Sequence, residues 1–118
     1  MAFMTAYGFV GQNNAKLVEY NDSRDYEHQT AMTFALGATG SETASVTVPL
    51  TNLNAGEVVL AVKSDQRLSA RIVDSVNTID ATLQFNRFLM VTLRGLTGLT
   101  LTNLAAVEAA VTVVLGDE

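Results

Sequence analysis

The chain has 118 residues, the size of one domain, because a single hydrophobic core is self-sufficient at about 100–150 residues. Its residues are 48% hydrophobic and 16% charged, which excludes a disordered polar chain and predicts that some apolar surface meets another subunit. The net charge of −5 argues against a nucleic-acid partner, since such binding depends on neutralising phosphates. The absence of cysteine excludes disulfides and thiolate metal sites.

No apolar run approaches the ~20 residues of a membrane-spanning helix, so we expect a soluble protein without a membrane partner. The opening "MAFMTAYGFVGQ" lacks the basic flank and apolar stretch of a secretory signal, and we expect no export. Residues 1–28 are predicted to form an N-terminal arm or the first strands, and residues 29–118 the main domain. Exposure of Phe3, Tyr7 and Phe9 would favour aggregation, so we predict that they contact a partner or a neighbouring subunit.

From Thr30 onward, short runs alternate apolar and polar residues, which is typical of half-buried strands. "GATGSE", "TNLNAG", "KSDQ" and "DSVN" supply turn-forming residues between these runs and are predicted to be connections. Five sets of residues each share one face of a predicted strand: Met32, Phe34 and Leu36; Val46, Val48 and Leu50; Val58, Leu60 and Val62; Leu68, Ala70 and Ile72; and Ile79, Ala81, Leu83 and Phe85.

The segment "NRFLMVTLRG" is apolar on both faces of a predicted strand. Leu89 and Val91 lie on one face, and Phe88 and Met90 lie on the other. The pattern predicts a strand covered on both sides, at the centre of a sheet or at a contact between subunits. The single proline, Pro49, cannot donate to a strand ladder and is predicted at an edge or at a strand end.

The C-terminal stretch "LTGLTLTNLAAVEAAVTVVLGD" can be interpreted as a helix capped by Asn103 or as two strands. The β-branched run "VTVVL" and the alternating "LTLT" favour two strands, Leu99–Thr102 and Ala110–Leu115, joined by a loop or one helical turn over Asn103–Ala109. Counted from Thr30 onward, the chain then has about eight predicted strands. We therefore predict an all-β fold, a single jelly-roll-like antiparallel β-sandwich with an N-terminal arm.

Candidate chemistry is sparse, and we predict no catalytic, cofactor-binding or metal-binding residues and no enzymatic activity. His28 is interpreted as a solvated loop residue. Four acids could supply oxygen ligands for calcium, but they are interpreted as solvated because "DSRDYE" does not have the ligand spacing of a calcium loop; these are Glu19, Asp22, Asp25 and Glu27. "GATGS" lacks the lysine of a phosphate loop and is predicted to be a hairpin turn. Arg67 and Arg71 share the strand face opposite Leu68, which predicts a solvent face or an intersubunit ion pair in preference to an anion groove.

The succession "VTVPLTNLNAGEVVLAVKS", "RIVDS", "GLTLTN" and "AAVTVVLGD" resembles the small β-sandwich structural proteins of tailed bacteriophages, notably capsid cement (decoration) proteins. The likeness covers about Ser45 to Asp117. It implies a protein without enzymatic activity that trimerises on the outer capsid surface of the virion and clamps neighbouring major capsid subunits. On this interpretation Phe3, Tyr7 and Phe9 are the first choice for the contacts with the shell.

Two other classes stay open. A phage head-fibre, tail or baseplate module would assemble into a tail complex or bind a host glycan. A small enzyme or carbohydrate-binding sandwich would need a cleft with carboxylates or aromatic planes, and the absence of tryptophan argues against it.

Overall fold

The chain is an all-β protein, as predicted. The computed structural model describes the backbone of residues 2–12, 15–26, 28–50 and 57–117, and the side chains of residues 30–50 and 57–116. Within these residues there is no helix, and every strand pair is antiparallel. The strands are β1 (Ala2–Gln12), β2 (Ala15–Tyr26), β3 (His28–Leu36), β4 (Ser45–Thr47), β5 (Val58–Asp74), β6 (Ile79–Leu93), β7 (Gly98–Asn103) and β8 (Ala109–Asp117).

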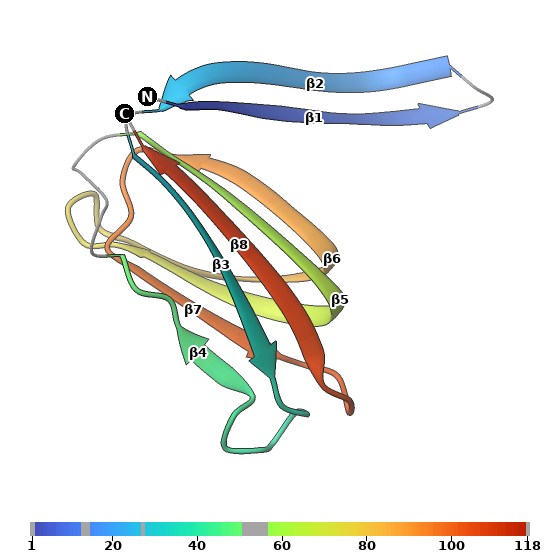
Figure 1. Cartoon of the computed structure of the whole chain (residues 1–118), viewed down its shortest axis with the longest axis vertical. Coiled ribbons are helices and arrows are strands. Elements are labelled where there is room, and N and C mark those ends of the chain that lie inside the picture. The colour runs from blue at the N-terminus through green and yellow to red at the C-terminus, as the bar shows by residue number, and fades with distance from the viewer. Residues whose placement is uncertain (1, 13–14, 27, 51–56, 118) are drawn as a thin grey trace.

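Strand β5 is the axis of a six-stranded sheet whose order is β3-β8-β5-β7-β4, with β6 also paired to β5. The first half of β5, Val58–Ser64, pairs with β8, and its second half, Leu68–Val73, pairs with β7. Strand β6 follows the opposite side of β5 along both halves. The sheet curls about β5 until it is nearly barrel-shaped (Figure 1).

A bulge in the β5–β6 hairpin produces this curl. The residues Ser64, Asp65 and Gln66 of β5 lie opposite the single residue Arg87 of β6, and Arg87 has a left-handed φ of 69°. Extra residues on one strand bend it and increase its twist without ending the pairing. The Ser64 side chain is buried, and its Oγ accepts a hydrogen bond of 3.0 Å from the Gln66 backbone N–H.

The predicted count of eight strands from Thr30 onward is wrong, because the sheet has six. The segment "KSDQ", a predicted connection, lies inside β5, and the two strands predicted beside Asn86 are the single strand β6. Polar residues with a propensity for turns form bulges as readily as they form turns, so local composition does not distinguish a bent strand from two strands.

Four of the five predicted strand faces lie in the core or pack against it, whereas Ile79, Ala81 and Leu83 of the fifth are exposed. The side chains of Leu60, Val62, Leu68 and Leu101 are fully buried, and Met32 and Phe34 pack against this cluster while half-buried. Alternate residues of β5, β7 and β8 point into the curl, as period-two patterning requires. Pro49 lies just beyond the end of β4, in agreement with the prediction.

The C-terminal stretch forms two strands, and the helix capped by Asn103 is excluded. Strands β7 and β8 are joined by residues 104–108, which form a bend without a helical turn. Asn103 is fully buried, and its Nδ2 donates hydrogen bonds to the carbonyl oxygens of Gly37 (2.9 Å) and Val107 (2.8 Å). Its Oδ1 accepts a bond of 2.9 Å from the Ala105 N–H. One side chain thereby holds two loops together.

The glycine-containing loop at residues 37–41 is a turn, but the hairpin predicted around it is wrong. Strand β3 pairs with β8 and β4 pairs with β7, so the loop crosses from one part of the sheet to another. Gly40 has a φ of 82°, which glycine adopts without the steric cost of a Cβ. The other glycine-containing connection, "TNLNAG" at residues 51–56, lies outside the described residues.

Strands β1 and β2 form a separate two-stranded sheet. They pair with each other from Ala2↔Tyr26 to Gln12↔Ala15 and with none of the other six strands. One residue separates the end of β2 at Tyr26 from the start of β3 at His28. The hairpin therefore extends away from the six-stranded sheet, as the blue strands of Figure 1 show.

We expect Asn103→Ala to lower the free energy of unfolding by about 2–3 kcal/mol, because it removes the side-chain partner of two part-buried carbonyl groups and of one N–H. Urea unfolding followed by far-UV circular dichroism measures the change. The control is Thr102→Ala, whose hydroxyl bonds to the exposed Ser45 hydroxyl, and we expect it to cost less than about 1 kcal/mol. Equal losses from both variants would contradict the structural role of Asn103.

Substitutions at Arg87 test the bend. Because a residue other than glycine is strained at positive φ, we expect Arg87→Gly to raise the free energy of unfolding by up to about 1 kcal/mol. Arg87→Val should lower it by at least about 1 kcal/mol, because a β-branched residue fits this conformation worst. The urea midpoint of each variant measures the effect. Glycine and valine variants of equal stability would rule out a left-handed conformation at this position.

Candidate interaction surface

Strand β6 is a long free edge. Within the described residues its 15 residues pair only with β5, so the backbone N–H and C=O groups on its other side have no strand partner. Such a row of groups is a template for pairing with another chain. The turn that leads into β6 is held by the buried carboxylate of Asp74, which accepts hydrogen bonds from the backbone of Val76 (3.2 Å) and Asn77 (3.3 Å) and from the Asn77 side chain (2.6 Å).

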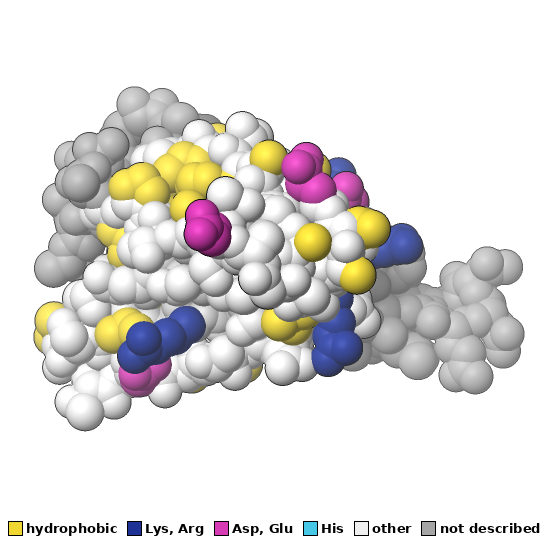
Figure 2. Space-filling model, turned by 90° about the horizontal axis from the view of Figure 1, so that it is seen from below, with side chains coloured by type: hydrophobic (Ala, Val, Ile, Leu, Met, Phe, Trp, Pro, Cys, Tyr) yellow, Lys and Arg dark blue, Asp and Glu magenta, His cyan; other side chains and the backbone are white. Residues whose placement is uncertain are grey.

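The hydrophobic core continues onto β6 and is open to solvent there. Leu83 lies opposite the fully buried Ala70 of β5, yet it is 40% exposed. Ile79, which shares this face, is 41% exposed. In Figure 2, hydrophobic side chains reach the surface in several places on one face of the molecule, among separate groups of charged side chains. The inward face of β6 therefore carries apolar side chains that its own sheet does not cover.

The outward face of β6 is also apolar beyond the bend. Phe88 is 56% exposed beside Lys63 of β5, and Met90 lies half-buried opposite Ala61. The prediction that this segment is central in the sheet is wrong, because β6 lies at an edge. Alternation showed that both faces are apolar, but it carried no information about what covers them. The second part of that prediction, a contact between subunits, stays open.

Charge does little to protect this edge. Natural edge strands are commonly shielded from aggregation by lysine, proline or inward-pointing charges. Strand β6 contains neither lysine nor proline, and its only charged residues are Asp80 and Arg87. Asp80 is engaged by Arg71, whose Nε and Nη2 donate hydrogen bonds of 3.0 and 2.7 Å to its two carboxylate oxygens. Arg71 therefore lies on the solvent face, as predicted, and its ion pair is formed within one chain and not between subunits.

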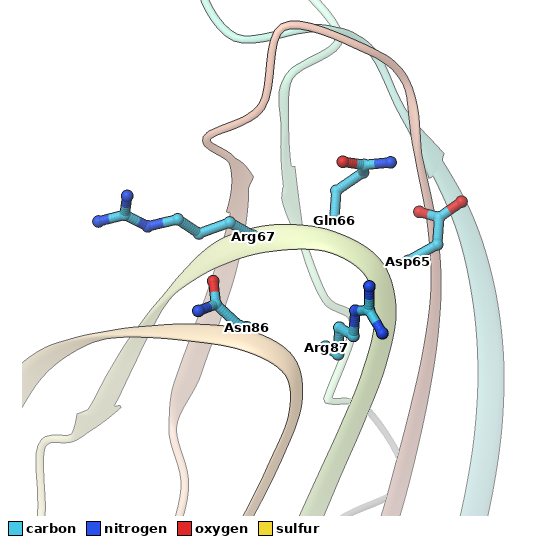
Figure 3. A pocket seen from close by; sticks show the side chains of 5 residues that line it. All are labelled: Asp65, Gln66, Arg67, Asn86 and Arg87. Atoms are coloured by element: carbon cyan, nitrogen blue, oxygen red, sulfur yellow. The ribbon is translucent and has the colours of Figure 1, made fainter.

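A recess lies at the bend of the β5–β6 hairpin, lined by Asp65, Gln66, Arg67, Asn86 and Arg87 (Figure 3). The Arg67 guanidinium donates a hydrogen bond of 2.7 Å to Gln84, and Asp65 accepts one of 2.9 Å from the Ala110 N–H. In Figure 3 the side chains of Arg67 and Arg87 extend in different directions. Their positive charges therefore do not converge on one anion, and the recess lacks the arrangement of an anion groove.

The other candidate residues lie outside the described side chains. These are the three predicted partner contacts Phe3, Tyr7 and Phe9, the histidine His28, and the acids Glu19, Asp22, Asp25 and Glu27. Among the described residues, no group of three or more histidine, cysteine or acidic side chains is placed to hold a metal ion. Within the same residues, no helix has the length and hydrophobicity to span a membrane.

Comparison with models of known protein families, with curated proteins and with solved structures finds no match for this chain. The function of the chain is therefore inferred from its own surface. The sequence identified the residues of β6 but not their position at an edge. One signal was available, since "IDATLQF" combines strict alternation with a single charge and no proline.

The Arg71–Asp80 pair predicts a pH dependence of stability. The hydrogen bond from Arg71 lowers the pKa of Asp80, burial opposes this lowering, and the charge of Arg71 adds to it. Because the folded state has the lower pKa, the pair stabilises the fold above the ordinary pKa of aspartate, and this stabilisation is lost as the pH falls through the lowered value.

We therefore expect Asp80→Asn to shift the urea midpoint slightly downward at neutral pH and to have no effect once the pH is below the lowered pKa. Both side chains are more than half exposed, so salt should reduce the difference. The neighbouring Thr82→Ala variant is the control without a titratable group. A difference between wild type and Asp80→Asn that stays constant from neutral to acid pH would exclude this pair as its source.

Proposed function

We propose that the protein is a structural protein of a tailed-phage virion, a capsid cement protein that forms a homo-oligomer and clamps neighbouring major capsid subunits on the outer surface of the shell. The free edge of β6, with Ile79, Leu83 and Phe88 exposed along it, is the observation that supports this proposal. The resemblance of residues 45–117 to such proteins supplies its biological setting.

An exposed apolar edge suits a protein whose role is assembly. Pairing along β6 satisfies backbone groups and removes its half-exposed side chains from water, at about 25 cal/mol for each Å² of apolar surface buried. One such contact is modest, but a shell repeats it many times, and linked subunits bind with avidity. Assembly of this kind requires no catalytic group.

The finer features belong to the same proposal. The curled sheet acts as the jelly-roll-like sandwich of a cement protein, and residues 1–28 act as its N-terminal arm. The expected oligomer is a trimer, because closed rotational symmetry lets one heterologous contact be satisfied in every subunit. Phe3, Tyr7 and Phe9 are proposed to contact the shell or a neighbouring subunit.

A lysine on the inward face of the edge tests the proposal. We expect Leu83→Lys to shift the oligomer toward monomer and to lower saturable binding to expanded, undecorated capsids of the same phage at least tenfold, because pairing would bury an unpaired charge. Analytical ultracentrifugation and capsid co-sedimentation measure the two effects. Leu83 is already 40% exposed, so the isolated domain should stay folded, and circular dichroism checks this.

The matched control is Val107→Lys, which adds the same charge at a residue that is 56% exposed in the β7–β8 loop, away from β6. It should leave oligomer and capsid binding unchanged. A wild-type chain that is monomeric and has no affinity for capsids would overturn the proposal. Binding to tail complexes in place of capsids would move the role to a fibre, tail or baseplate module.

A further inference from the structure

We propose that the β1–β2 hairpin of one copy pairs through β1 with the free edge of β6 in a second copy, so that copies of this chain assemble by exchanging a hairpin. This inference rests on the proposed role in assembly and names the occupant of the β6 edge. It joins the hairpin, which pairs with no other strand of the described structure, to the longest edge strand of the six-stranded sheet.

The hairpin needs a partner of its own. Strands β1 and β2, of 11 and 12 residues, pair only with each other, and an isolated two-stranded hairpin is at best marginally stable in water. The sequence of β1, "AFMTAYGFVGQ", contains no charged residue and three aromatic residues. A strand of this composition is expected to be buried against another strand.

Strand β6 matches β1 in length and in pattern. The 15 residues of β6 are enough to pair with all 11 residues of β1. Phe3, Tyr7 and Phe9 occupy odd positions of β1, on one side of the register shift between Val10 and Gly11, so their positions share one strand face. Added to β6, that face extends the row that includes Ile79 and Leu83, whose exposure shows that the row is incomplete.

The charges of the two parts are complementary. In a chain of net charge −5, residues 58–94 carry five bases against three acids, whereas residues 1–28 carry two bases against four acids. All three acids in residues 58–94 accept hydrogen bonds within the chain, Asp80 from Arg71, Asp74 within its own turn and Asp65 from the Ala110 N–H. Opposite net charges favour the approach of a hairpin from one copy to the β5–β6 hairpin of another.

The connection between β2 and β3 favours a second copy over the same chain. Only residue 27 separates the two strands, so the hairpin stays tied to the start of β3. In this position the hairpin pairs with neither β3 nor β6 of its own chain, since β1 and β2 pair only with each other. The edge of β6 that the chain's own hairpin leaves unpaired is therefore open to the hairpin of a second copy.

The proposed contact between β1 of one copy and β6 of another, the β1–β6 junction, is tested with two variants, each of which alters one of the two strands. Tyr7→Lys places a charge in β1, and Leu83→Lys places one on β6. We expect each variant alone to be monomeric where the wild type is oligomeric. An equimolar mixture should form heterodimers, since the Leu83→Lys chain donates an intact β1 to the intact β6 of the Tyr7→Lys chain. Native mass spectrometry detects the heterodimer, because the two chains differ in mass.

Asn21→Lys is the matched control for the hairpin. Asn21 lies opposite Tyr7 on β2, one strand further from β6, so this variant should keep the oligomer. Circular dichroism and a thermal midpoint close to that of the wild type show that each variant retains its fold.

The outcomes separate the two proposals. Loss of the oligomer in Leu83→Lys with full retention in Tyr7→Lys would overturn hairpin exchange and leave assembly through β6, by β6 of a second copy or by another protein. A mixture that stays monomeric would also overturn hairpin exchange, because no β1–β6 junction forms. Oligomers that survive both substitutions would overturn hairpin exchange and the assembly role of the β6 edge together.

Discussion

The continuous pairing of β5 is the constraint on which the rest of the fold depends. This strand of 17 residues pairs with β6 on both sides of the bulge. On its other edge it pairs with β8 before the bulge and with β7 after it. Because the pairing does not end at the bulge, the two halves of the sheet stay connected and curl around a single core. The strained conformation of Arg87 and the buried hydroxyl of Ser64 mark the position where the direction of the sheet changes.

The interior of this curled sheet is well packed, but the edge strand β6 has a strand partner on one side only. The interior faces of β5, β7 and β8 are buried, and Asn103 supplies the hydrogen bonds that close the loops at one end. Strand β6 receives a partner on one side only, although its residues have the pattern of a strand that is covered. A fold with this imbalance is suited to association with another chain, which is why an assembly role is the proposal that the surface favours.

The strand faces were predictable because side chains alternate strictly along an extended backbone. Residues such as Leu60, Val62 and Leu101 therefore lie in the core as expected. The number of strands was not predictable, since "KSDQ" has the composition of a turn and the structure uses it for a bulge. The partners of β3 and β4 were not predictable either, because the turn at residues 37–41 has the same sequence character in a hairpin and in a crossing loop.

The sequence by itself determined the all-β class, the inward and outward face of each strand and the position of Pro49, because these properties depend on local geometry and on a repeat of two residues. Only the tertiary structure decided that β5 and β6 are unbroken, that Asn103 bonds to two loops, and that β6 lies at an edge. These features depend on which distant segments pair, and pairing is selected by the packing of the whole core. The exposure of Leu83 beside the buried Ala70 is the clearest case, since both have the same pattern in the sequence and differ only in their neighbours.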